Sequence, residues 1–149
     1  MMETNFSNPY PRHGVPTLIP EIVSVCPDAY DEKSVRVVGR VDHYDAFKCI
    51  ALLSEPNKPS SSSVKLRVNT RLTDQADYIV GSQVMLIGEL EKVDLSACDL
   101  ADDFTHGSGG IELRARVSRC IDGLDYAVYC KGVDIWRQFN SDMNMEHSS

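Results

Sequence analysis

The sequence offers few side chains that could form a catalytic site. His43 and Asp45 lie two residues apart in the segment HYD, and a histidine beside a carboxylate can act as a general acid and base. No nucleophile motif accompanies the pair, so a polar turn accounts for it better. The acidic cluster of Asp99, Asp102 and Asp103 lacks the glycine and the terminal glutamate of a calcium-binding loop. The sequence therefore predicts that this protein is not an enzyme.

The cysteines and glycines give no sign of a metal or cofactor site. The five cysteines are Cys26, Cys49, Cys98, Cys120 and Cys130. None forms a C-x-x-C pair, and no two of them flank a histidine pair at zinc spacing. No glycine-rich phosphate loop follows a strand and opens a helix. We expect no cofactor and no metal, and scattered thiols of this kind fit a reducing compartment.

The charge of the chain bears on nucleic-acid binding. The net charge is −7, from 22 acidic and 15 basic residues. Nucleic-acid affinity comes largely from neutralising phosphates and releasing counterions. An acidic chain is therefore a poor candidate for tight binding alone, although it can contribute to a surface that a partner completes. The longest apolar runs have about five residues, far short of the roughly 20 that a membrane span needs, so no membrane association is expected.

The chain divides into one domain and two tails. Residues 1–14, rich in Asn, Ser and Pro, and residues 141–149 show no periodicity and predict disordered tails. The N-terminal segment also lacks the apolar region of a secretory signal. Residues 15–140 are long enough for a single domain with its own core.

Five segments of this domain predict strands, because apolar residues alternate or run together in them. The segments are Ser34–Val41, Cys49–Leu53, Val64–Asn69, Gln83–Glu91 and Ile111–Val117. Gly39 and Gly88 interrupt the first and fourth, where a bend or bulge is expected. A polar connection with possible helical character, Arg71–Tyr78, joins the third strand to the fourth. This order predicts an all-β, five-stranded Greek-key barrel of the OB type, although another small barrel or sandwich would give a similar pattern.

Basic residues occupy outward positions on the predicted strands. In an OB barrel the third and fifth strands are neighbours, so Lys65, Arg67, Arg114 and Arg116 would share one outer patch. Such a patch could contact nucleic-acid phosphates or an acidic partner. The alternative is an ordinary solvated face that acids such as Glu112 offset. The patch also lacks the aromatic platforms that single-strand binders use for stacking.

A C-terminal helix follows Asp122-Gly123, with Asp125 placed to cap its first turn. At about 100° per residue, the following residues fall within one arc of roughly 140°: Leu124, Val128, Tyr129, Gly132, Ile135, Trp136 and Phe139. A helix that packs only on the end of its own barrel needs a narrower stripe of apolar residues than this. The breadth of the arc and its aromatic residues therefore favour a partner interface that includes Tyr129, Ile135 and Trp136. Alternatively, all these residues pack on their own barrel.

Four segments, in this order, resemble one known family. They are VRVVGRVDHYD, KLRVNTRL, YIVGSQVMLIGELE and ELRARVSRCIDGLDYAVYCKGVDIWRQF. Together they resemble the Ten-one family, the smallest subunit of the CST (Ctc–Stn–Ten) telomere complex, over residues 14–139. The loops 92–110 and 60–63 are longer than the family pattern, and the former is more acidic.

The resemblance implies a single OB fold with a C-terminal helix that binds the N-terminal OB domain of the Stn-one subunit. It implies assembly with the large Ctc-type subunit on telomeric single-stranded DNA, in the nucleus at chromosome ends. Such a complex protects the ends, limits telomerase and helps DNA polymerase alpha–primase fill in the complementary strand. In the family, a first-strand arginine and an aromatic near the end of the last helix contact the partner. They match Arg36 and Phe139 here.

Two other functions stay open from the sequence. The small subunit of replication protein A has nearly the same architecture, and the segments 80–91 and 122–125 favour the Ten-one resemblance over it. An autonomous single-strand DNA binder is the other, and the net charge and sparse aromatics disfavour it.

Overall fold

The computed structural model describes residues 14–23, 33–59, 64–93 and 110–148. The predicted N-terminal tail, apart from Gly14, and most of the acidic loop lie outside these ranges. In chain order the elements are β1 (Val15–Pro16), α2 (Ile19–Val23), β2 (Ser34–Asp45), β3 (Ile50–Ser54), β4 (Leu66–Asn69), the 3₁₀ helix η1 (Gln75–Asp77), β5 (Gln83–Lys92), β6 (Ile111–Cys120) and α4 (Tyr126–Ser148).

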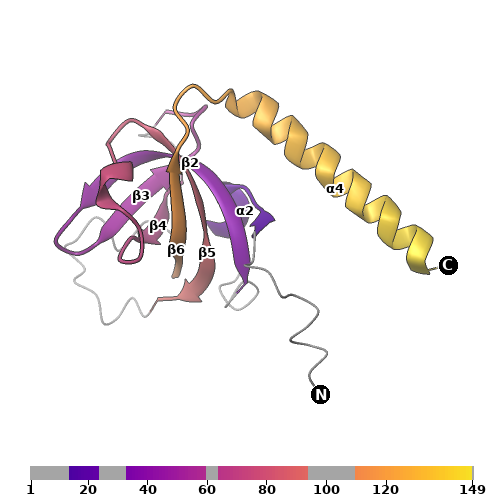
Figure 1. Cartoon of the computed structure of the whole chain (residues 1–149), viewed down its shortest axis with the longest axis horizontal. Helices are drawn as coiled ribbons and strands as arrows, with labels where there is room; N and C mark the ends of the chain where they lie inside the picture. Colours follow the sequence, from indigo (N-terminus) through magenta and orange to yellow (C-terminus); the bar gives the residue numbers. More distant parts are fainter. Residues whose placement is uncertain (1–13, 24–32, 60–63, 94–109, 149) are drawn as a thin grey trace, which may run out of the picture.

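Five strands close into a barrel, as predicted (Figure 1). Strand β2 pairs with β3, and β3 with β4, both antiparallel. Strand β6 lies parallel to β4 and antiparallel to β5. The antiparallel pairing of β2 with β5 closes the barrel. The third and fifth predicted strands are therefore neighbours, and the polar connection between β4 and β5 holds the short helix η1, which confirms the OB order.

Helix α2, which supplies part of the core, was not predicted from the sequence. Helix α2 covers the barrel with Ile19 and Ile22, both fully buried. Gly39 was expected at a bend, but its register with β5 is regular and the irregularity in β2 falls between Val41 and His43. A Cβ on Gly39 would lie 3.0 Å from the side chains of Ile19 and Leu53. The glycine therefore makes room for α2 and β3 rather than bending the strand.

Gly88 does lie at an irregularity, between β5 and β6. A Cβ there would fall on the backbone of Arg114 and within 2.9 Å of the Cα of Ala115, so only glycine permits this close approach. The same irregularity shifts the alternation of β6. Ala115 points into the core, but Val117, which strict alternation would place on the same face, is 40% exposed.

Two predicted strand ends differ from the structure. Cys49 lies in the turn before β3, with a φ of 57°. Val64 precedes β4 and is 47% exposed, although its period-two spacing from Leu66 and Val68 would place it on the inner face of a strand. The five residues of β3 itself are all buried, as its apolar run predicts.

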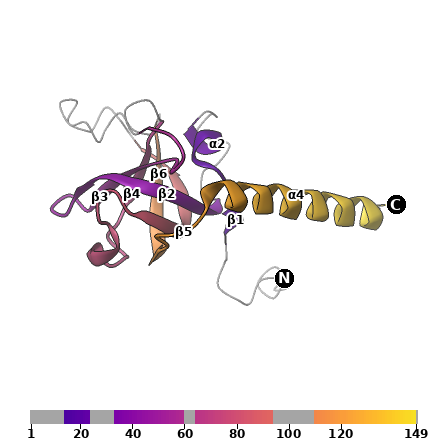
Figure 2. The ribbon, with the colours of Figure 1, turned by 90° about the horizontal axis from the view of Figure 1, so that it is seen from above.

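Helix α4 leaves the barrel and extends outward (Figures 1 and 2). Asp125 caps it as predicted, because its Oδ1 accepts hydrogen bonds from the backbone N–H groups of Ala127 and Val128. The helix continues to Ser148, past position 140, where the sequence pattern predicts the start of a tail. Residues 141–148 contain neither glycine nor proline, so nothing in them interrupts helical hydrogen bonding.

Candidate functional site

Three contacts attach the base and middle of α4 to the rest of the fold. The hydroxyl of Tyr126 donates a buried hydrogen bond of 3.1 Å to Oε2 of Glu55, at the end of β3. Val133 is 5% exposed. Arg137 donates to both carboxylate oxygens of Glu21 on α2, each at 2.8 Å, and to the carbonyl oxygen of Pro16 at 3.0 Å. Neither Val133 nor Arg137 belongs to the apolar arc that the sequence predicts, so the pattern missed both as contacts to the rest of the fold.

The electrostatics of these contacts follow from the partners. The hydrogen bonds from Arg137 lower the pKa of Glu21, and its partial burial opposes them only in part. Burial raises the pKa of Tyr126, with Cys130 and Glu55 adding to the effect. Tyr126 therefore stays a neutral donor and Glu21 a charged acceptor at neutral pH, which keeps both contacts in place.

The packing side of α4 is distinct from the predicted apolar arc. Four of the arc's large residues are exposed: Val128 (60%), Ile135 (66%), Trp136 (43%) and Phe139 (61%). They lie within roughly 100° of one another around the helix, about 120° away from Tyr126 and Val133. The alternative in which the whole arc packs on its own barrel is therefore wrong for these four. We call them the apolar face of α4.

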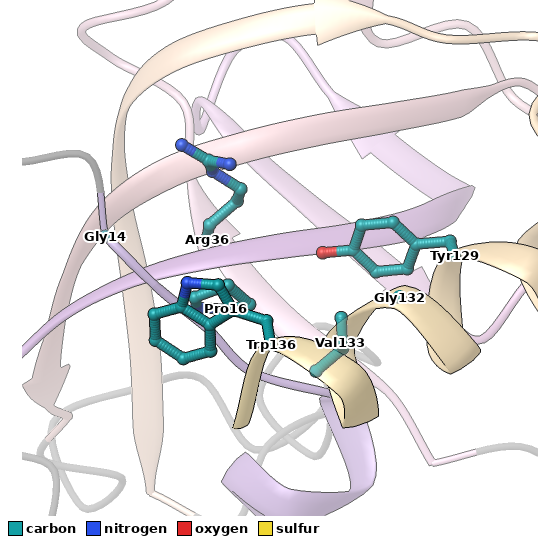
Figure 3. Close-up of a pocket in the computed structure, with 7 residues that line it drawn as sticks. All are labelled: Gly14, Pro16, Arg36, Tyr129, Gly132, Val133 and Trp136. Atoms are coloured by element: carbon teal, nitrogen blue, oxygen red, sulfur yellow. The ribbon is translucent and has the colours of Figure 1, made fainter. Parts of the chain in front are cut away.

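Tyr129 lies between the two sides of the helix and borders a cavity of about 380 Å³ (Figure 3). The cavity is lined by Gly14, Pro16, Arg36, Tyr129, Gly132, Val133 and Trp136. Strands β1 and β2 form one wall and α4 the other. Figure 3 shows the Tyr129 side chain reaching from α4 toward the strands.

Two polar atoms at this cavity have unmet hydrogen bonds. The Nε of Arg36 and the hydroxyl of Tyr129 are buried, and neither has a hydrogen-bond partner in the part of the chain that the structure describes. Burial raises the pKa of Tyr129, while the charge of Arg36 partly lowers it. A buried donor without an acceptor costs about 1–3 kcal/mol. An acceptor that reached these two atoms would remove that cost.

The four basic residues predicted to share an outer patch lie on or beside neighbouring strands, and each is paired with a carboxylate. Lys65 contacts Asp42. Arg67 contacts Glu112 at 2.8 Å, Arg114 contacts Glu91 at 2.8 Å, and Arg116 contacts Glu89 at 2.9 Å. The surface is thus a mixed array of acids and bases rather than a basic patch. A role of Lys65, Arg67, Arg114 and Arg116 in DNA contact stays a prediction.

His43 and Asp45 belong to the β2–β3 hairpin. Oδ1 of Asp45 accepts hydrogen bonds from the backbone N–H groups of Phe47 and Lys48, so this carboxylate shapes the turn. Within the described ranges, no three His, Cys, Asp or Glu side chains are grouped so that they could hold a metal ion. No helix among the described residues is long and apolar enough to cross a membrane.

Comparison with known proteins gives related sequences and folds. CST complex subunit TEN1 of Mus musculus is 26% identical over 100 residues, which cover 67% of this chain. They cover 53% of the mouse protein, so the match spans about half the length of that relative.

Solved structures share the fold at low sequence identity. A chain of the S. pombe Stn1–Ten1 complex has a TM-score of 0.56 at 14% identity, covering 87% of this chain and 96% of that one. A chain of the U. maydis replication protein A structure bound to single-stranded DNA has a TM-score of 0.52 at 14% identity, covering 87% and 96%. These likenesses confirm the OB barrel with a C-terminal helix, and they do not separate the two protein classes.

The family is decided by a match over nearly the whole chain. A model described as a telomere-capping CST complex subunit matches residues 10–143, which include the barrel and the apolar face of α4. The chain therefore belongs to the family of telomere-capping subunits of the CST complex.

Proposed function

We propose that this chain is a non-catalytic subunit that binds an Stn1-type (Stn-one) OB subunit through α4 and the adjoining barrel wall. The observation that carries this proposal is the apolar face of α4, whose three most exposed large residues are each at least 60% exposed. Large exposed apolar and aromatic residues gathered on one helix face are typical of protein interfaces. The interface would include Arg36, Tyr129, Ile135, Trp136 and Phe139.

The attachment of α4 supports this role. The helix is anchored by Tyr126 and Arg137 on its packing side, so its apolar face is presented in a set direction. A rigid element loses little conformational entropy on binding, which favours affinity. The Nε of Arg36 and the hydroxyl of Tyr129 have no hydrogen-bond partner among the described residues, and an acceptor from the partner would supply one.

In the assembled complex, the Stn1-type subunit would link this chain to a Ctc-type large subunit on telomeric single-stranded DNA. The complex would cap chromosome ends in the nucleus, limit telomerase and support fill-in by DNA polymerase alpha–primase. This chain would stabilise its partner and add modestly to DNA binding. Its net charge of −7 and its paired basic residues favour such a supporting role over independent DNA binding.

The second candidate is the small subunit of a replication protein A-type complex, favoured by the likeness to the U. maydis structure. Affinity purification of the tagged full chain from nuclear extract, with mass spectrometry, separates the two. Recovery of Stn1-like and Ctc-like proteins is the expected result. Recovery of the large and middle replication protein A subunits instead would overturn the telomeric assignment and keep the fold.

A further inference from the structure

We propose that Gly132 is a notch on α4 that receives an acceptor-tipped side chain of the partner, and that it thereby determines which partner fits. This inference rests on the proposed function, because it concerns the same face of the protein. Gly132 lines the cavity between α4 and the barrel, and it lies between Tyr129 and Trp136 on the helix surface.

The fold itself does not require glycine at this position. A Cβ on Gly132 would have no heavy atom within 4 Å, and the residue does not have a positive φ. By contrast, a Cβ on Gly14 or Gly88 would clash with backbone atoms. Glycine is one of the poorest residues for a helix interior. Its presence in the middle of α4 therefore points to something outside the chain that approaches the helix backbone closely.

The surroundings of the notch indicate what would approach. Trp136 and Val133 give the cavity apolar lining, and Arg36 and Tyr129 line it toward the barrel. Within the described ranges, the buried Nε of Arg36 and hydroxyl of Tyr129 lack a hydrogen-bond partner. A side chain with an apolar stem and an acceptor at its tip would fill both parts. Because one of the donors is a guanidinium, a carboxylate is the acceptor that complements it best. The occupant we assign is therefore an aspartate or glutamate of the partner that crosses Gly132 and ends between Arg36 and Tyr129.

The test compares affinity with stability in two substitutions. Gly132→Ala and Gly132→Leu would be purified as full chains, and their binding to the Stn1-type subunit measured by calorimetry. Because the site has open space, we expect both variants to fold, with melting temperatures raised by about 2–4 °C. Binding should nevertheless weaken, several-fold for Ala and about 10- to 100-fold for Leu, because the notch is overfilled. Gln138→Leu, exposed on another side of the same helix, is the matched control and should bind normally.

The outcomes separate this inference from the proposed function. If Gly132→Leu binds like the unmodified chain while Phe139→Glu does not bind, Gly132 does not receive a partner side chain. The proposed interface on α4 is then unaffected. Stronger binding by Gly132→Ala would also overturn the proposed role of Gly132. It would show that the glycine only destabilises the helix and makes no room for the partner. If the unmodified chain fails to bind the Stn1-type subunit, the proposed function is wrong, and the proposed role of Gly132 is wrong with it. If the partner side chain is an aspartate or glutamate, Arg36→Gln should weaken the salt dependence of binding. An unchanged salt dependence would overturn the assignment of an acidic side chain.

Discussion

Arg137 and Glu21 are 116 positions apart in the chain and form a two-bond ion pair, with both nitrogen–oxygen distances at 2.8 Å. The pair joins the middle of α4 to α2, and Arg137 also holds the carbonyl oxygen of Pro16 in β1. Parallel bonds between a guanidinium and a carboxylate fix direction as well as distance. The short N-terminal elements therefore help to set the angle at which α4 leaves the barrel.

The ion pair predicts an acid-sensitive contribution to stability. The pKa of Glu21 is lowered by Arg137 below its ordinary value of 4.5, so the unfolded chain binds more protons in acid than the folded chain does. The stabilisation is complete above about pH 4.5 and is lost as the pH falls through the folded pKa. Because both side chains are about one third exposed, we expect Arg137→Gln to cost about 0.5–1 kcal/mol at pH 7.

Urea unfolding of both proteins from pH 7 to pH 2.5 measures this difference. The gap between the unmodified chain and Arg137→Gln should close as Glu21 takes up a proton. Asp42 titrates in both proteins, since its pKa is also lowered: burial raises it, but its bonds to Lys65, Ser54 and Arg40 outweigh the burial. A gap that stays constant down to pH 2.5 would mean that Arg137 acts by packing alone.

Phe139→Glu should abolish binding to the Stn1-type subunit without unfolding the barrel. Phe139 is 61% exposed, so its replacement removes little buried area from the isolated chain. In a complex, a carboxylate at an apolar contact would be desolvated, and we expect affinity to fall at least about 100-fold. Calorimetry and thermal unfolding check the two parts. Gln138→Glu carries the same new charge on another side of α4 and should bind normally; equal loss in both variants would indicate a general charge effect.

The barrel could be predicted from the sequence because apolar and polar residues alternate along its strands. Val35, Val37 and Val41 are buried as their spacing indicates, and the order of strands around the connection Arg71–Tyr78 specified the topology. Helix α2 escaped prediction because five residues do not show a helical period. The role of Gly39 also depended on α2, which packs over it.

The site was predicted less completely. The arc of apolar residues on α4 was visible, but its division into a packing side and an exposed face was not, since Val133 and Val128 are the same residue type. The ion pairs of Arg67, Arg114 and Arg116 depend on strand register, which brings acids of β5 and β6 beside them. Sequence position alone identified the bases and named Glu112 among the acids that offset them, but it did not show which acid lies beside which base.

The paired bases predict weak binding of single-stranded DNA by the isolated chain. We expect a dissociation constant of micromolar or weaker near physiological salt, because Arg114 and Arg116 are already engaged by Glu91 and Glu89. Replacing both glutamates, as Glu89→Gln with Glu91→Gln, should release the two arginines. Affinity should then rise about 10-fold, and the salt dependence should steepen by roughly 0.7 for each phosphate contacted.

Fluorescence anisotropy with a labelled oligonucleotide over a salt series measures both quantities. The control is Asp134→Asn with Asp142→Asn on α4, which changes the net charge equally, from −7 to −5, since two acids are removed in each case. If the control binds as tightly as the β5 variant, net charge rather than released arginines is responsible. Submicromolar binding by the unmodified chain would instead support an autonomous DNA binder.

Gly88→Ala should destabilise the barrel strongly, while Gly39→Ala should have a smaller effect. The added Cβ at Gly88 would meet the backbone of Arg114, and β5 and β6 cannot separate there without breaking their ladder. At Gly39 its nearest contacts would be the Cδ atoms of Ile19 and Leu53 at 3.0 Å, which can shift, and the Cβ of Leu53 at 3.1 Å. We expect a loss of about 3 kcal/mol or more at Gly88 and about 1 kcal/mol at Gly39 by urea unfolding. Equal losses in the free energy of unfolding would show that β5 and β6 can move apart around an added Cβ as readily as the side chains over Gly39 can.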